Sequence, residues 1–85
     1  GMSERKSILV TGAGAGIGRA ILMHFAGLGW RVAGLDVDVA ALGELRAVLP
    51  PGDALLTEAD VSDERAVASA FAELAKWLSD DPLTT

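Results

Sequence analysis

The residues of this sequence whose types and spacing could do chemistry are four glycines in one short segment, Gly12, Gly14, Gly16 and Gly18. Backbone N–H groups at the N-terminus of a helix bind a phosphate group when no side chain blocks its approach. We expect Gly12 to form a tight turn, and Gly14 and Gly16 to leave room for a pyrophosphate. The missing side chain of Gly18 is expected to allow the following helix to pack closely on the preceding strand.

The spacing of these glycines separates several kinds of phosphate-binding loop. A P-loop requires Gly-x-x-x-x-Gly-Lys followed by Ser or Thr, but the only basic residue here is Arg19 and Ala20 follows it. The pattern Gly-x-Gly-x-x-Gly would require a glycine in place of Ile17 or Arg19, depending on the register. The pattern that fits is Gly-x-x-x-Gly-x-Gly, formed by Gly12, Gly16 and Gly18.

Two aspartates follow later apolar runs of the sequence. Asp36 comes eighteen residues after Gly18, near the ~20-residue spacing at which a carboxylate accepts hydrogen bonds from an adenosine ribose. A carboxylate there repels a ribose 2′-phosphate, and Val37 offers no cation to bind one, so NAD is favoured over NADP. The alternative is an ordinary turn aspartate.

The second aspartate, Asp60, ends the next apolar run and is followed by Val61. We expect its carboxylate to accept a hydrogen bond from an adenine amino group, with the Val61 backbone completing the contact with the base. The alternative is a structural one, in which Asp60 helps Ser62 to cap the next helix. The glycine segment, Asp36 and Asp60 each lie at the end of a predicted strand. Together they indicate a binding site for a nucleotide more specifically than any one of them alone.

The composition excludes several classes of function. With no Cys and a single histidine, His24, we expect no metal site, and with no Tyr no phenolic acid or base. A net charge of −5 argues against binding of nucleic acid, because phosphate contacts need clustered Lys or Arg. No apolar run approaches the ~20 residues of a membrane-spanning helix, and no signal-peptide core is visible. We therefore expect a soluble, cytoplasmic protein.

Apolar runs and helical periodicity alternate along the chain. Strands are predicted at residues 8–10, 31–35 and 54–59, and a helix at residues 39–49. A first helix begins at Ile17, and glycines at positions 27 and 29 end it. A third helix is capped by Ser62. The expected buried faces are Ile17, Ala20, Ile21, Phe25 and Leu28 in the first helix, Leu42, Leu45, Val48 and Leu49 in the second, and Val67, Ala70, Phe71, Leu74 and Leu78 in the third.

This order predicts an α/β fold with a parallel sheet and flanking helices, β-α-β-α-β-α followed by the start of a fourth strand at residues 83–85. Right-handed crossovers place the first two helices on one face and the third on the other. Residues 1–7 are interpreted as a tag remnant and an N-terminal lead, since Gly1 precedes Met2. Residues 8–85 are interpreted as the N-terminal part of a longer domain.

The segment from Thr11 to Ala20, together with Asp36 and the pair Asp60-Val61, resembles the cofactor-binding half of a short-chain dehydrogenase/reductase. The resemblance implies a Rossmann-type dinucleotide-binding domain. In such a domain the segment from Gly12 to Ile17, which includes Gly14, Ala15 and Gly16, surrounds the pyrophosphate. Asp36 then binds the adenosine ribose, and Asp60 and Val61 contact adenine. Ala15 replaces a basic residue that NADP-preferring members often carry, which again points to NAD.

The same resemblance implies hydride transfer between NAD and a carbonyl or alcohol substrate in a longer, homo-oligomeric parent protein. The family's catalytic Ser and Tyr-x-x-x-Lys come later than the matching segment, and no residue of this sequence is assigned a catalytic role. Two alternatives remain. One is a fragment of an S-adenosylmethionine-dependent methyltransferase, although Val10 stands where that family usually has an acid. The other is a non-catalytic, truncated nucleotide-binding fragment.

Overall fold

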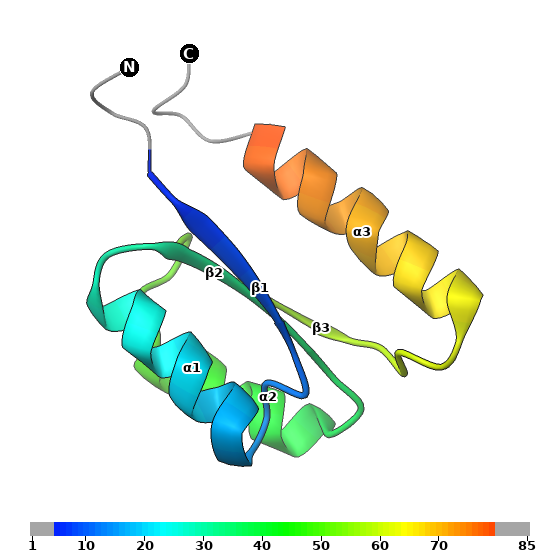
Figure 1. Ribbon diagram of the computed structural model, residues 1–85, viewed down its shortest axis with the longest axis horizontal. Helices are drawn as coiled ribbons and strands as arrows, with labels where there is room; N and C mark the ends of the chain where they lie inside the picture. Colours follow the sequence, from blue (N-terminus) through cyan, green and yellow to red (C-terminus); the bar gives the residue numbers. More distant parts are fainter. Residues whose placement is uncertain (1–4, 80–85) are drawn as a thin grey trace.

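Three apolar runs form the strands β1 (Ser7–Thr11), β2 (Arg31–Asp36) and β3 (Ala54–Glu58) of a parallel sheet in the order β1-β2-β3. The structure is a computed structural model and describes residues 5–79 (Figure 1). In the register of the sheet, Ala33 lies between Leu9 of β1 and Leu55 of β3. The central strand β2 is buried along its first five residues, because it has a neighbour on both sides and helices on both faces.

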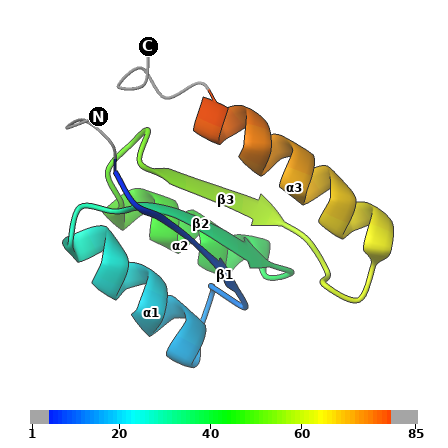
Figure 2. The same ribbon diagram turned by 45° about the horizontal axis from the view of Figure 1, so that its top comes forward.

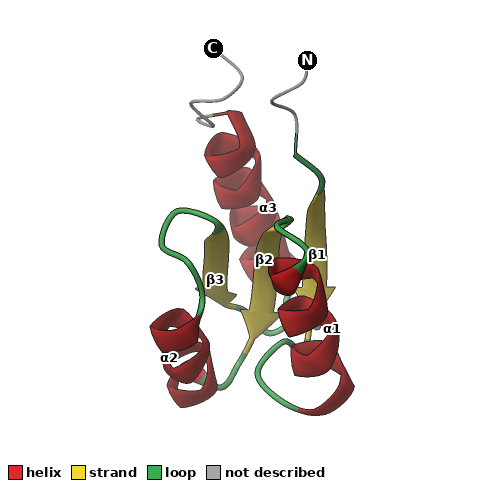
Figure 3. Ribbon diagram, turned by 90° about the vertical axis from the view of Figure 1, so that its left-hand side faces the viewer, coloured by secondary structure: helices red, strands yellow, loops and turns green. Residues whose placement is uncertain are grey.

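The helices are α1 (Gly16–Gly27), α2 (Val39–Val48) and α3 (Glu64–Ser79), each following a strand. Helices α1 and α2 cover one face of the sheet and α3 lies on the other (Figures 2 and 3). The predicted Rossmann-type α/β arrangement of three strands and three helices is therefore confirmed, including the faces on which the helices lie. The strands end within one residue of the predicted bounds.

The core beneath α1 and α2 is larger than the core beneath α3. The first contains the buried residues Val10, Ala13, Leu22, Val32, Leu42, Leu45, Leu49 and Leu56, and the second contains Leu35, Ala59 and Ala70. The predicted buried face of α1 was largely wrong: Phe25 packs against this core, but Ala20 is exposed. Ile17 is 79% exposed, and Ile21 and Leu28 are exposed too, whereas Leu22 is completely buried. In α2 the predicted Val48 is exposed, and in α3 so are Phe71 and Leu78.

Of two predicted helix ends, the glycine stop of α1 is confirmed and the cap of α3 differs. The glycine that ends α1 is Gly29, with φ +84°, and its N–H donates to the carbonyl of Ala26 at 3.0 Å. The N–H of Trp30 donates to Phe25, which completes a Schellman motif in which Gly27 is simply the last helical residue. At α3 the cap is Asp63, not Ser62, because the Asp63 carboxylate accepts from the N–H groups two and three residues later.

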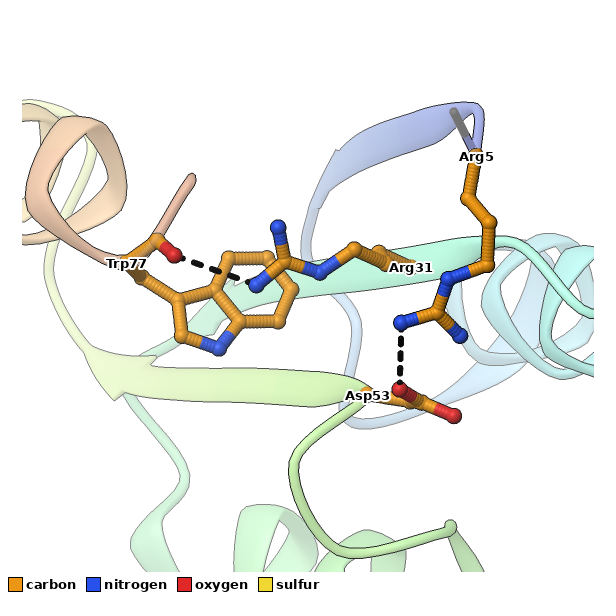
Figure 4. A network of polar contacts seen from close by, with 4 residues as sticks. All are labelled: Arg5, Arg31, Asp53 and Trp77. Atoms are coloured by element: carbon orange, nitrogen blue, oxygen red, sulfur yellow. Dashed lines mark hydrogen bonds and ion pairs between the residues drawn. The ribbon is translucent and has the colours of Figure 1, made fainter. Parts of the chain in front are cut away.

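Helix α3 is also attached to the sheet by polar contacts. Arg31, at the start of β2, is only 5% exposed, and its guanidinium lies 3.9 Å from the centroid of the Trp77 ring. Its Nη2 donates to the Trp77 carbonyl oxygen at 3.1 Å (Figure 4). Arg5 pairs with Asp53 at 2.9 Å in the same region, and the Thr57 hydroxyl bonds to Glu73 of α3. These contacts supplement a small apolar core.

Some expectations fall on residues that the structure does not describe. The fourth strand at residues 83–85 lies outside the described range, as does most of the N-terminal lead. Within residues 5–79, no helix combines the length and apolar character needed to cross a membrane.

Candidate dinucleotide-binding site

The carboxyl ends of the three parallel strands lie at one edge of the sheet, so the turns that follow them lie close together. The turn at residues 12–15 follows β1, and we call it the glycine-rich turn. Its Ala13 is completely buried and donates its N–H to the Leu35 carbonyl of β2 at 3.1 Å. A side chain at Gly34 would lie 2.7 Å from the Ala13 Cβ, so this strand glycine makes room for the turn.

Two of the motif glycines have conformations that other residues rarely adopt. Gly12 has φ +66° and Gly16 has φ +57°, which bend the chain out of β1 and into α1. Gly18 is needed for a different reason, since a Cβ there would lie 2.1 Å from the Gly12 carbonyl oxygen. The turn and the first turn of α1 therefore pack backbone against backbone, as expected from the sequence.

The N-terminus of α1 carries no capping side chain. Its N-cap residue is Ala15, whose extended backbone (φ −155°, ψ 165°) suits a cap but whose methyl group accepts no hydrogen bond. The N–H groups of the first helical turn and the helix dipole are therefore available to an anion. Ile17, in the same first turn of α1, is exposed.

Asp36 is the acidic group nearest the glycine-rich turn. Its Oδ2 accepts a hydrogen bond from the N–H of Gly14 at 2.7 Å, and its Oδ1 accepts one from the N–H of Asp38 at 2.9 Å. These N–H groups lower the pKa of Asp36 below its ordinary value, so the carboxylate is ionised at neutral pH. A negative charge thus lies at the end of β2, next to the turn.

Asp60, at the turn after β3, lines the same hollow as Asp36. The hollow has a volume of about 250 Å³ and is lined by Gly12, Leu35, Asp36, Val37, Ala59, Asp60 and Val61. The Asp60 Oδ1 accepts from both the N–H and the hydroxyl of Ser62, at 2.9 and 2.7 Å, and these bonds lower its pKa. Asp60 therefore stabilises its own turn and also lines the hollow. It does not cap α3, because Asp63 does so.

The structure brings most of the predicted site residues together. Gly12, Asp36, Asp60 and Val61 line one hollow, and Gly14 contacts Asp36 directly. Ala15, Gly16 and Ile17 lie at the adjacent start of α1, and Gly18 packs behind the turn. Sequence reasoning missed Gly34 and Ala41. A glycine within a predicted strand was a signal for Gly34, whereas nothing in the sequence marks Ala41.

The comparison with protein families separates the dehydrogenase interpretation from the methyltransferase alternative. The family model described as short chain dehydrogenase matches residues 6–81. The chain belongs to the short chain dehydrogenase family. This family consists of oxidoreductases with a Rossmann-like fold. Membership in it argues against the methyltransferase alternative.

Among curated relatives, the chain is 39% identical over 83 residues to the (3R)-3-hydroxyacyl-CoA dehydrogenase of Homo sapiens, an alignment that covers 87% of this chain and 32% of that protein. The chain therefore spans about a third of that relative's length.

Solved structures of the family share the fold. A short chain dehydrogenase/reductase family oxidoreductase from Aeromonas hydrophila aligns with a TM-score of 0.80 at 29% identity, covering 85% of this chain and 34% of the other. A closed serine dehydrogenase complexed with NADP+ aligns with a TM-score of 0.74 at 30% identity, covering 78% of this chain and 26% of the other. Relatives of this chain thus bind a nicotinamide dinucleotide, and family membership alone does not decide between NAD and NADP.

Proposed function

We propose that this chain forms the NAD-binding part of a short chain dehydrogenase that transfers a hydride between NAD and a carbonyl or alcohol substrate. The observation that carries the proposal is the Asp36 carboxylate, held ionised at the rim of the hollow beside the glycine-rich turn. A carboxylate in this place accepts hydrogen bonds from ribose hydroxyls and repels a 2′-phosphate. Among residues 5–79, no Lys or Arg lines the hollow to bind such a phosphate.

In this proposal the pyrophosphate lies over the uncapped N-terminus of α1. The exposed residues Gly12, Ala15, Gly16 and Ile17 supply its contacts. Gly14 and Gly18 shape the turn, since the N–H of Gly14 bonds to Asp36 and the missing side chain of Gly18 lets the helix pack on the turn. Asp36 binds the adenosine ribose. Adenine occupies the hollow between the turns after β2 and β3, where Val37 and Val61 are exposed and Asp60 accepts from the exocyclic amino group.

The cofactor supplies the hydride chemistry when bound, and the residues of this chain bind and orient it. The sequence contains no tyrosine, so the Tyr-x-x-x-Lys pair of the family is not among these residues. We propose that the catalytic groups, the substrate pocket and a homo-oligomeric interface belong to parts of the protein beyond this segment, and that the protein works in the cytoplasm.

Calorimetric titration of the chain with NAD and with NADP tests the cofactor preference. We expect NAD to bind more tightly, and Asp36→Ala to reduce the ratio of the two affinities by about tenfold, because a charge-assisted contact and a repulsion are both removed. Asp38→Asn is the matched control, since it removes a charge two residues away and keeps the capping oxygen of α2. Tighter binding of NADP to the unchanged chain would overturn the proposal.

A further inference from the structure

Asp36 joins two turns that are far apart in the sequence. Its Oδ2 accepts from Gly14, in the glycine-rich turn after β1, and its Oδ1 accepts from Asp38, in the turn after β2. The bond to Gly14, at 2.7 Å, is shorter than the usual 2.9–3.0 Å of a neutral N–H···O bond, as expected for an ionised acceptor. We propose that Asp36 is a positioning residue, which holds the glycine-rich turn in its binding conformation through the N–H of Gly14.

The packing around Gly14 supports this role. Gly14 is buried, and a Cβ built on it would lie 2.8 Å from the Asp36 Oδ2 and 2.9 Å from the Cβ of Ala41. Its φ is not positive, so the position needs glycine for space and not for backbone conformation. A side chain there would push the carboxylate away from the Gly14 N–H. The absent side chain and the small Ala41 of α2 therefore serve the contact with Asp36.

Two successive N–H groups attach the turn to β2. Ala13 donates to the backbone carbonyl of Leu35, and Gly14 donates to the side chain of the next residue, Asp36. On either side of them, Gly12 and Ala15 are exposed. The bond from Gly14 to the Asp36 side chain can be removed by a substitution, whereas the bond to the Leu35 backbone cannot. The conformation of the turn therefore depends on which side chain residue 36 carries.

The carboxylate has the capacity for both of its roles. An ionised aspartate offers about four acceptor sites, of which the N–H groups of Gly14 and Asp38 occupy two, and the N–H of Val37 also acts on the carboxylate. Acceptor capacity therefore remains for a ribose hydroxyl group. This part of the inference rests on the proposed NAD site, whereas the contact between Asp36 and Gly14 exists in the protein without a ligand.

Amide hydrogen exchange of the ligand-free chain, followed by NMR, tests the positioning role. In Asp36→Ala we expect the Gly14 amide to exchange about tenfold faster or more, because a hydrogen bond to a charged acceptor is lost. Asp36→Asn keeps one acceptor oxygen, so it should restore part of the protection. Asp38→Asn leaves Asp36 in place and should leave exchange at Gly14 unchanged. Unaltered Gly14 exchange in Asp36→Ala would overturn the inference.

A binding experiment separates the positioning role from the ribose contact. The probe is an NAD analogue whose adenosine ribose lacks the 2′ and 3′ hydroxyls, titrated into the unchanged chain and into Asp36→Ala. If Asp36 also positions the turn, Asp36→Ala weakens binding of the analogue severalfold. Equal affinity of the two proteins for the analogue would confine Asp36 to the ribose and contradict the inference. Absence of any dinucleotide binding would contradict the proposed function, and the exchange experiment would still decide the positioning role.

Discussion

The three helices begin at the same edge of the sheet, but their first turns are completed differently. Asp38 caps α2 by accepting from the N–H of Ala41 at 3.0 Å, and Asp63 caps α3 through two N–H groups. The corresponding residue of α1 is Ala15. An aspartate-to-alanine change at a cap costs about 1 kcal/mol, so α1 forgoes a stabilisation that the other two helices have. In the proposed function, the phosphate of a ligand accepts from the N–H groups that are left uncapped at the start of α1.

The two ends of α1 differ in a similar way. At its beginning, Gly18 has a backbone oxygen within 2.1 Å of the position of a Cβ, whereas nothing lies within 4 Å of the corresponding position at Gly27, the last helical residue. The same residue type is thus a steric requirement at the site and replaceable at the far end. Among the glycines of α1, the one with the closest backbone contact therefore lies at the proposed binding site.

The largest expected effect comes from Gly18→Ala. Its Cβ would overlap the Gly12 carbonyl oxygen, which is backbone and cannot move without shifting the whole turn. We expect the free energy of unfolding, measured with urea, to fall by about 3 kcal/mol. Gly27→Ala is the matched control in the same helix, and should raise stability by up to about 1 kcal/mol. Equal stability of the two variants would show that the turn is not packed as described.

A smaller effect is expected when α1 is made like its neighbours. Ala15→Asp places an acceptor at the N-cap, which should raise the free energy of unfolding by about 1 kcal/mol. The same carboxylate occupies an N–H group and repels the pyrophosphate, so NAD binding should weaken by about tenfold or more, equivalent to ~1.4 kcal/mol. Urea unfolding and calorimetric titration measure the two effects.

Ala15→Ser is the control for this prediction, because a hydroxyl caps the helix without adding charge. It should stabilise the chain and weaken NAD binding less than Ala15→Asp does. Unchanged NAD affinity in Ala15→Asp would place the pyrophosphate away from the start of α1.

The order of the strands and the helices followed from the sequence because short apolar runs and glycine-rich turns are local signals. The buried face of α1 did not follow. Its apolar residues surround much of the helix, so the spacing fits several faces, and only the contact with the sheet selects Leu22 over Ile17. The cap of α3 was misplaced by one residue because Ser62 and Asp63 are both good capping residues, and Asp60 engages Ser62.

At the site, the glycine spacing and both aspartates were visible in the sequence, but their contacts were not. Gly14 was expected to leave room for a phosphate, and the structure shows that it also leaves room for Asp36. This contact joins residues 22 positions apart and depends on how two turns approach each other. The approach is determined by the sheet register and by the small Ala41 in α2, neither of which a local pattern encodes.

The smallest expected effect concerns acid. The pKa of Asp36 is lowered from its ordinary value of 3.8 by the N–H groups of Asp38 and Gly14, and that of Asp60 by Ser62. A group whose pKa is lower in the folded state stabilises the fold fully above its unfolded pKa, and this stabilisation disappears as the pH falls through the folded pKa. Urea unfolding midpoints should therefore decrease below about pH 5. The decrease should be shallower in Asp36→Asn. Asp38→Asn leaves the bonds from the N–H groups of Gly14 and Asp38 to Asp36 in place, so its unfolding midpoint should decrease as in the unchanged chain. An equally steep decrease in Asp36→Asn would mean that the hydrogen bonds of the Asp36 carboxylate contribute nothing to the loss of stability in acid.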